Sequence, residues 1–159
     1  MRRIIITCVC ATFPFAAVAE SQLDRLENIS EQMNAAMFEA MVRMAEKEGA
    51  NPAPLRAAIP DGAWDDSFRK AGACLLDKYN AAAGKDEINK MLDAMDAAIP
   101  QMADMDLDSS GDEFDFLPDG MTDDLAIQIN SECGLTQLSL DRMEASGFTA
   151  ALMQSMAGN

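Results

Sequence analysis

The chain of 159 residues carries 27 acidic and 12 basic side chains and no histidine, which gives a formal net charge of −15 at neutral pH. A charge this negative disfavours nucleic acids and anionic lipid surfaces as partners. The absence of histidine removes the commonest general base and every zinc site that depends on imidazole.

The first 19 residues have the features of an export signal. Two arginines precede an apolar run over residues 4–18, and Ala17-Val18-Ala19 is the small-x-small pattern that signal peptidase cleaves. The run is too short for a membrane span, so we expect residues 1–19 to be a cleaved signal peptide. The mature chain would begin at Glu20, form a single domain over residues 20–159 and carry 10 − 27 = −17 net charges. We expect it in the periplasm or, alternatively, outside the cell.

Cys74 and Cys133 are the two cysteines that remain after the signal. In an oxidising compartment such a pair is expected to form a disulfide. The bond would close a loop of 59 residues and stabilise the fold by about 4 kcal/mol in the chain-entropy model. A redox-active pair is disfavoured, because the cysteines are not in a Cys-x-x-Cys arrangement and no histidine is present to lower a thiol pKa.

A long first helix is predicted from Ser21 to Glu48, where apolar residues recur every three or four positions. Gly49 should end it, and residues 51–54 form a connector with two prolines. The many methionines predict a core that is filled in large part by Met, or an adaptable partner surface if the stripe escapes burial. Copper(I) ligation by these thioethers is disfavoured without histidine. The stripe consists of Leu23, Leu26, Met33, Met37, Ala40 and Met44.

Two further helices are predicted before the acidic region. One runs from about Ala63 to Ala83 and ends at Gly84, and the next covers about Asp86 to Ile99. Pro100 should stop or kink the second of these, because proline lacks the backbone donor and clashes with the preceding turn.

The C-terminal third predicts a short helix and a longer one. Thr122 is a good N-cap for a helix that reaches about Cys133, and the last helix covers about Thr136 to Ala157 despite Gly147 within it. No alternating run predicts a strand. The fold class is therefore all-α, a small helical bundle of four or five helices cross-linked by one disulfide.

Two segments resemble one another, residues 60–66 (PDGAWDD) and residues 118–124 (PDGMTDD). Each precedes a cysteine, 14 and 15 residues after its proline. The resemblance indicates either an internal duplication of a helical pair or a chance match in a chain rich in Asp and Ala, and we favour the chance match.

An acidic loop is expected at about residues 104–120, and its stretch 104–115 reads DMDLDSSGDEFD. In one register acids fall on all five side-chain ligand positions of an EF-hand loop, but Ser109 takes the glycine position. A register that begins two residues later places Gly111 correctly but puts Leu117 at the last ligand position. We therefore favour an exposed acidic linker, with low-affinity calcium binding as the alternative. The candidate ligands are Asp104, Asp106, Asp108, Asp112 and Asp115.

Enzymatic motifs are not found in the sequence: it has no glycine-rich phosphate loop and no nucleophile elbow. The pairs Asp65-Asp66 and Asp123-Asp124 could act as acid and base, but their positions at helix starts are explained by the helix dipole. We expect an exported, acidic, non-enzymatic binding or accessory module of the cell envelope. We expect its partner to be an unidentified protein and not a nucleic acid. We expect no stable membrane insertion after signal cleavage and no cofactor other than weakly bound calcium.

Overall fold

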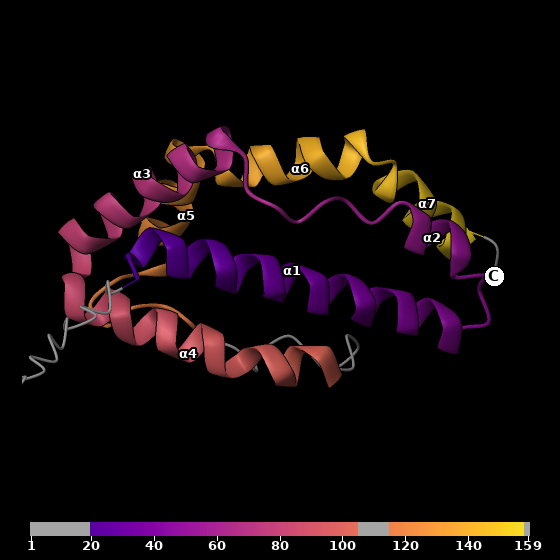
Figure 1. Ribbon diagram of the computed structural model, residues 1–159, viewed down its shortest axis with the longest axis horizontal. Coiled ribbons are helices and arrows are strands. Elements are labelled where there is room, and N and C mark those ends of the chain that lie inside the picture. Colours follow the sequence, from indigo (N-terminus) through magenta and orange to yellow (C-terminus); the bar gives the residue numbers. More distant parts are fainter. Residues whose placement is uncertain (1–19, 105–114, 158–159) are drawn as a thin grey trace, which may run out of the picture.

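The computed structural model describes residues 20–104 and 115–157, and this part of the chain is entirely helical. Figure 1 shows the long α1 between α4 on one side and α3, α6 and α7 on the other. The predicted all-α class is confirmed, but the described residues form seven helices rather than four or five. The helices are α1 (Gln22–Lys47), α2 (Ala53–Ala57), α3 (Asp66–Ala83), α4 (Lys85–Asp104), α5 (Asp123–Cys133), α6 (Leu135–Ala145) and α7 (Phe148–Ala157).

Local signals account for most helix boundaries. Ser21 caps α1 by accepting a hydrogen bond from the backbone N–H of Asp24, and Thr122 caps α5 in the same way through Leu125. Gly84 ends α3 at a φ of 90°, a conformation that residues with a Cβ rarely adopt. The predicted cap at Thr122 and the predicted stop at Gly84 are thus confirmed.

Three local predictions need correction. α4 does not end at Ile99 but continues to Asp104 with Pro100 inside it, and the exposed Pro100 interrupts only the solvent side of the last turns. The single helix predicted over residues 136–157 is divided into α6 and α7 by Gly147, which has a φ of 78°. The connector after α1 contains the extra short helix α2, which begins directly after Pro52.

α1 is buried on more than one face because it is packed from both sides. Its buried side chains include Leu26 and Ala40 of the predicted stripe. They also include Ile29, Phe38 and Val42, which lie outside the stripe. Met33 and Met37 of that stripe are only half-buried. The prediction of a core made largely of Met is therefore wrong for the described residues, where the buried methionines are Met91 and Met121.

The apolar interior is divided into two clusters at the two ends of α1. The disulfide-end core joins the first half of α1 to α3, α4 and α5, and the far-end core joins its second half to α2 and α7. The buried members of the disulfide-end core are Leu26, Ile29, Leu75, Leu76, Tyr79, Ile88, Met91, Leu92, Met121 and Ile129. Those of the far-end core are Phe38, Val42, Ala45, Leu55 and Phe148.

The predicted disulfide is confirmed. Cys74 of α3 and Cys133 of α5 are joined, with their Cα atoms 5.7 Å apart. The bond fixes α5 to the disulfide-end core. None of the described helices combines the length and the apolar character that a membrane span requires.

The two similar segments each lead into one of the disulfide-bonded helices. Pro60 and Pro118 are both buried. The backbones differ at the equivalent glycines, because Gly120 has a φ of 86° while Gly62 does not have a positive φ. The choice between an internal duplication and the favoured chance match stays open.

Candidate functional site

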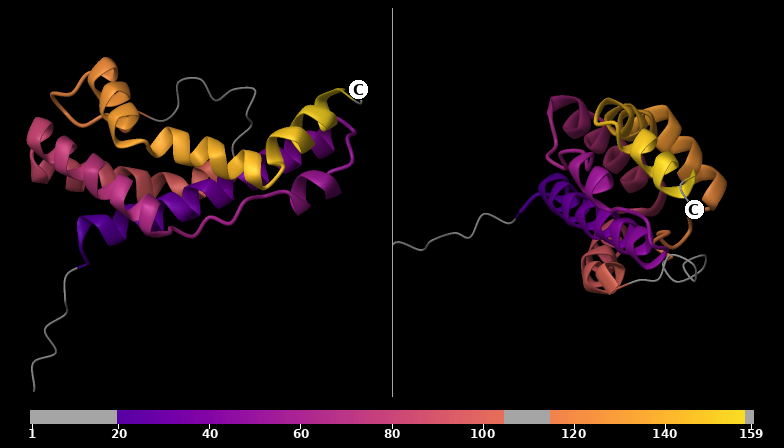
Figure 2. Two further views of the ribbon diagram at one scale, coloured as in Figure 1. Left: turned by 90° about the horizontal axis from the view of Figure 1, so that it is seen from above. Right: turned by 90° about the vertical axis from the view of Figure 1, so that its right-hand side faces the viewer.

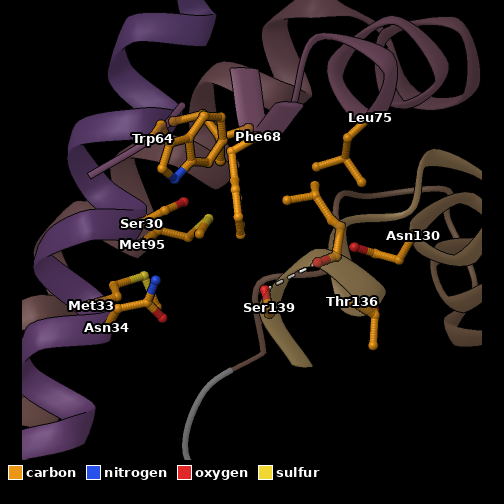
Figure 3. Close-up of a pocket in the computed structure, with 12 residues that line it drawn as sticks. Ser30, Met33, Asn34, Trp64, Phe68, Leu75, Met95, Asn130, Thr136 and Ser139 are labelled. Atoms are coloured by element: carbon orange, nitrogen blue, oxygen red, sulfur yellow. Dashed lines mark hydrogen bonds between the residues drawn. The ribbon is translucent and has the colours of Figure 1, made fainter. Parts of the chain in front are cut away.

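A central cavity of about 320 Å³ lies between α1, α3, α4, α5 and α6. Its volume is at the lower end of the range for ligand-binding pockets. Figure 3 shows Trp64 and Phe68 on one side of it, with Thr136 and Ser139 across from them. The apolar lining consists of Leu26, Met33, Trp64, Phe68, Leu75, Met95 and Leu135, and the polar lining of Ser30, Asn34, Asn130, Thr136 and Ser139.

Trp64 forms one wall of the cavity and is held by close packing. Its backbone N–H donates to the Glu31 carboxylate at 3.1 Å, which ties the segment before α3 to α1. The indole lies against Gly72, where an added Cβ would come within 2.3 Å of a ring carbon. Only glycine leaves room for the ring at this position, so Gly72 sets the position of Trp64.

Arg142 of α6 stabilises the same wall of the cavity from the opposite side. Its guanidinium donates to the backbone carbonyls of Asp61 and Ala63 at 3.0 and 2.8 Å. It also lies over the ring of Phe68, 3.9 Å from the centroid, in a cation–π contact. These contacts hold α6 and the segment before α3 together.

The polar groups of the cavity fall into two kinds. The Asn130 amide donates to the Tyr79 hydroxyl at 3.1 Å and to the backbone of its own helix, and the Ser139 hydroxyl donates to the Leu135 carbonyl. The side chains of Ser30, Asn34 and Thr136 make no hydrogen bond within the described part of the chain. They are therefore free to bind a guest molecule or water.

The lining of the central cavity is uncharged, because none of its twelve residues is acidic or basic. Behind the wall, the Tyr79 hydroxyl accepts from the lining Asn130, and the pKa of Tyr79 is raised by burial and lowered to a smaller extent by this hydrogen bond. The lining can thus bind a molecule by apolar contact and neutral hydrogen bonds, but it offers no side chain to transfer a proton at neutral pH.

The predicted calcium ligands fall largely outside the described residues. Asp106, Asp108 and Asp112 lie there, while Asp104 is the last residue of α4. Asp115 is exposed, and its carboxylate accepts a hydrogen bond from the backbone N–H of Leu117 at 2.9 Å. Residues 20–104 and 115–157 contain no group of three acidic, cysteine or histidine side chains that could hold a metal. The calcium hypothesis stays a prediction.

The aspartate pairs occupy helix starts, as the sequence indicates. Asp65 is the N-cap of α3 and accepts from the backbone N–H groups of Ser67 and Phe68, and the second of these bonds is the main cause of its lowered pKa. Asp123 and Asp124 lie in the first turn of α5. The capping interpretation of Asp65 is confirmed.

The sequence contains weak signals for the cavity. Ser30 and Asn34 interrupt the apolar face of α1 one turn apart, and both line the cavity. Trp64 is the only tryptophan of the chain. Asn130 gave no signal, because its role depends on the packing of α5 against α3.

Comparison with protein-family models, with curated proteins and with solved structures found no match for this chain. What the protein does is therefore inferred from the cavity and its surroundings.

Proposed function

We propose that this protein is an exported, non-enzymatic binding module of the cell envelope, and that it binds its partner in the central cavity. The observation that carries the proposal is an uncharged, half-apolar cavity of about 320 Å³ in a chain with a net charge of −15. Pockets of this kind bind ligands by apolar contact, and a few polar groups orient the guest.

The methionines of the cavity wall suit a binding role. Met33 comes from α1 and Met95 from α4, and both are half-buried. Methionine side chains are flexible and polarisable, so such a wall adapts to the shape of a guest. The free hydrogen-bonding groups of Ser30 and Asn34 on the same face of α1 would orient it.

Catalysis by this site is disfavoured on chemical grounds. The sequence has no histidine, and both cysteines of the predicted mature chain are consumed by the disulfide. Neither an imidazole nor a thiolate is then available as base or nucleophile.

Binding can be measured through Trp64, the only tryptophan, with the disulfide-bonded protein and a neutral apolar dye such as N-phenyl-1-naphthylamine. We expect saturable binding with one dye per chain and a change in the fluorescence of Trp64. Ser139 lines the cavity from α6, so the ring introduced by Ser139→Phe should occupy the cavity. Dye binding should then fall about tenfold or more. Leu140→Phe places the same ring at an exposed position on a different side of α6, outside the central cavity and its neighbouring hollows, and should bind as the unmodified protein does.

Failure would be clear in this experiment. Dye binding that does not saturate, or that is equally weak in both variants, would contradict the central cavity as the binding site.

Export is tested separately, by mass spectrometry of the protein isolated from its own host. We expect the chain to begin at Glu20 and to be found in the envelope fraction.

A further inference from the structure

Two neighbouring hollows share lining residues with the central cavity, and we refer to the three hollows together as the groove. Toward the start of α5 a hollow of about 370 Å³ shares Leu26, Leu75 and Met95 with the central cavity. In the other direction a hollow of about 80 Å³ shares Asn34 and Phe68 with it. Three hollows in a row suit an elongated guest that inserts several side chains, rather than one compact small molecule.

The end of the groove near α5 is acidic. Asp115 and Asp123 line this hollow, and both are exposed. Neither forms an ion pair within the described residues. Their negative charge therefore faces solvent at the entrance to an apolar hollow.

The opposite end of the groove contains a cationic side chain, but this side chain is already engaged in contacts within the protein. Arg142 lines the small hollow, and its guanidinium donates to two backbone carbonyls and to the Asp65 carboxylate. Asp61, which lines the same hollow, is exposed. The charges left for a guest along the described part of the groove are thus negative.

We propose that the groove binds a cationic amphipathic segment of a partner protein. Its apolar face would place two or three large side chains in the hollows, and its Lys or Arg side chains would lie against Asp115 and Asp123. This is the helix-in-groove mode of recognition, with charge complementarity at the rim. The inference rests on the proposed function, since it names the partner of the same site.

Other guests fit the groove less well. A lipid chain carries no positive charge that could lie against Asp115 and Asp123 at the rim of the groove. An acidic peptide, or a second copy of this chain with its charge of −15, would be repelled.

Two synthetic peptides of about 14 residues test the proposal. Both carry the same leucines on one helical face, while the other face has Lys in one peptide and Glu in the second. We expect the Lys peptide to bind the disulfide-bonded protein about tenfold more tightly than the Glu peptide at low salt. Raising the NaCl concentration from about 50 to about 500 mM should weaken the Lys peptide severalfold, because salt screens exposed charges.

A matched pair of double variants separates the acidic rim from the general negative charge. Asp115→Asn with Asp123→Asn should weaken the Lys peptide about fivefold. The control, Asp77→Asn with Asp86→Asn, removes two exposed charges outside the groove, and Asp86, like Asp123, lies in the first turn of a helix. Its affinity for the Lys peptide should stay within about twofold of that of the unmodified protein. Ser139→Phe should weaken the Lys peptide and leave the melting temperature unchanged.

The outcomes distinguish the two proposals. If the dye binds but the Lys and Glu peptides bind equally, or if the two double variants weaken binding equally, the cationic partner is wrong while the binding site stands. If neither dye nor peptide responds to Ser139→Phe, the proposed function fails as well. The inference is supported if the affinity for the Lys peptide falls both in Ser139→Phe and in the double variant of Asp115 and Asp123.

Discussion

The two ends of α1 are packed differently, although they belong to one continuous helix. At the disulfide end ten buried residues from α1, α3, α4, α5 and the segment before α5 form the core, and a covalent bond adds to it. At the far end five buried residues hold α2 and α7 against α1. Figure 2, in the view from above, shows α7 over this half of α1, where Phe148 and Phe38 are in contact. Because stability follows buried apolar contact, the far end should open first, and the groove is built mainly on the more stable end.

The largest expected effect is the loss of the disulfide. Cys74→Ala with Cys133→Ala should lower the free energy of unfolding by about 4 kcal/mol, because the unfolded chain regains the entropy of a 59-residue loop. Chemical denaturation with and without a strong reductant measures the same effect in the unmodified protein. An unchanged unfolding midpoint after complete reduction would contradict the prediction.

The far-end core depends on one aromatic contact. Phe148 of α7 is 2 % exposed, and its ring meets Phe38 of α1 edge-on at 4.7 Å between centroids. Phe148→Ala should cost about 3 kcal/mol and should speed hydrogen exchange in α2 and α7 but not in α3. Met153→Ala on the same helix removes a side chain that is 68 % exposed, so it serves as the control. Equal exchange changes at both ends would show that the two cores unfold as one unit.

Gly72 tests how the groove wall is supported at the disulfide end. Gly72→Ala improves helix propensity, but its methyl group would stand 2.3 Å from the Trp64 ring. We expect a net loss of about 1 to 2 kcal/mol and a shift of the Trp64 emission to longer wavelength, since the ring must move outward. Gly62→Ala is the control, because its Cβ would meet only the Glu31 carbonyl at 3.9 Å.

The cap of α3 gives a smaller, pH-dependent effect. The folded protein lowers the pKa of Asp65, mainly through the hydrogen bond from the Phe68 backbone. A lowered carboxyl pKa stabilises the fold above the unfolded value of about 4, and this contribution is lost as the pH falls through the lower folded value. Asp65→Ala should therefore destabilise the protein at pH 7 and much less at about pH 2. A loss of the same size at both pH values would contradict the ionic cap.

The smallest expected effect concerns calcium. Because the acidic loop fits neither register of an EF-hand, we expect the same melting temperature in a chelator and in millimolar calcium. A rise that Asp112→Asn and Asp115→Asn each remove would instead support the calcium-binding alternative. Calorimetry on the full chain gives a second measurement.

The sequence predicted part of the local structure, such as individual helix caps and stops, because these depend on neighbouring residues, but it misplaced the effects of Pro100 and Gly147. Thr122 and Gly84 act within one turn of their own helices. The pairing of Cys74 with Cys133 was predictable for another reason, because only two cysteines remain after the predicted signal peptide. The groove was not predicted, since it requires Met33, Trp64 and Thr136, from three separate parts of the chain, to meet. The Met stripe was assigned to the core because periodicity identifies an apolar face but not what covers it.

The sequence by itself determined an acidic, all-helical chain with a structural disulfide, since charge, period and cysteine number are properties of the residues. Only the tertiary structure decided that α1 is packed from two sides and that part of its apolar face remains open. Long-range packing fixes which side chains are covered, and it leaves Met33 and Asn34 at the wall of an uncharged cavity.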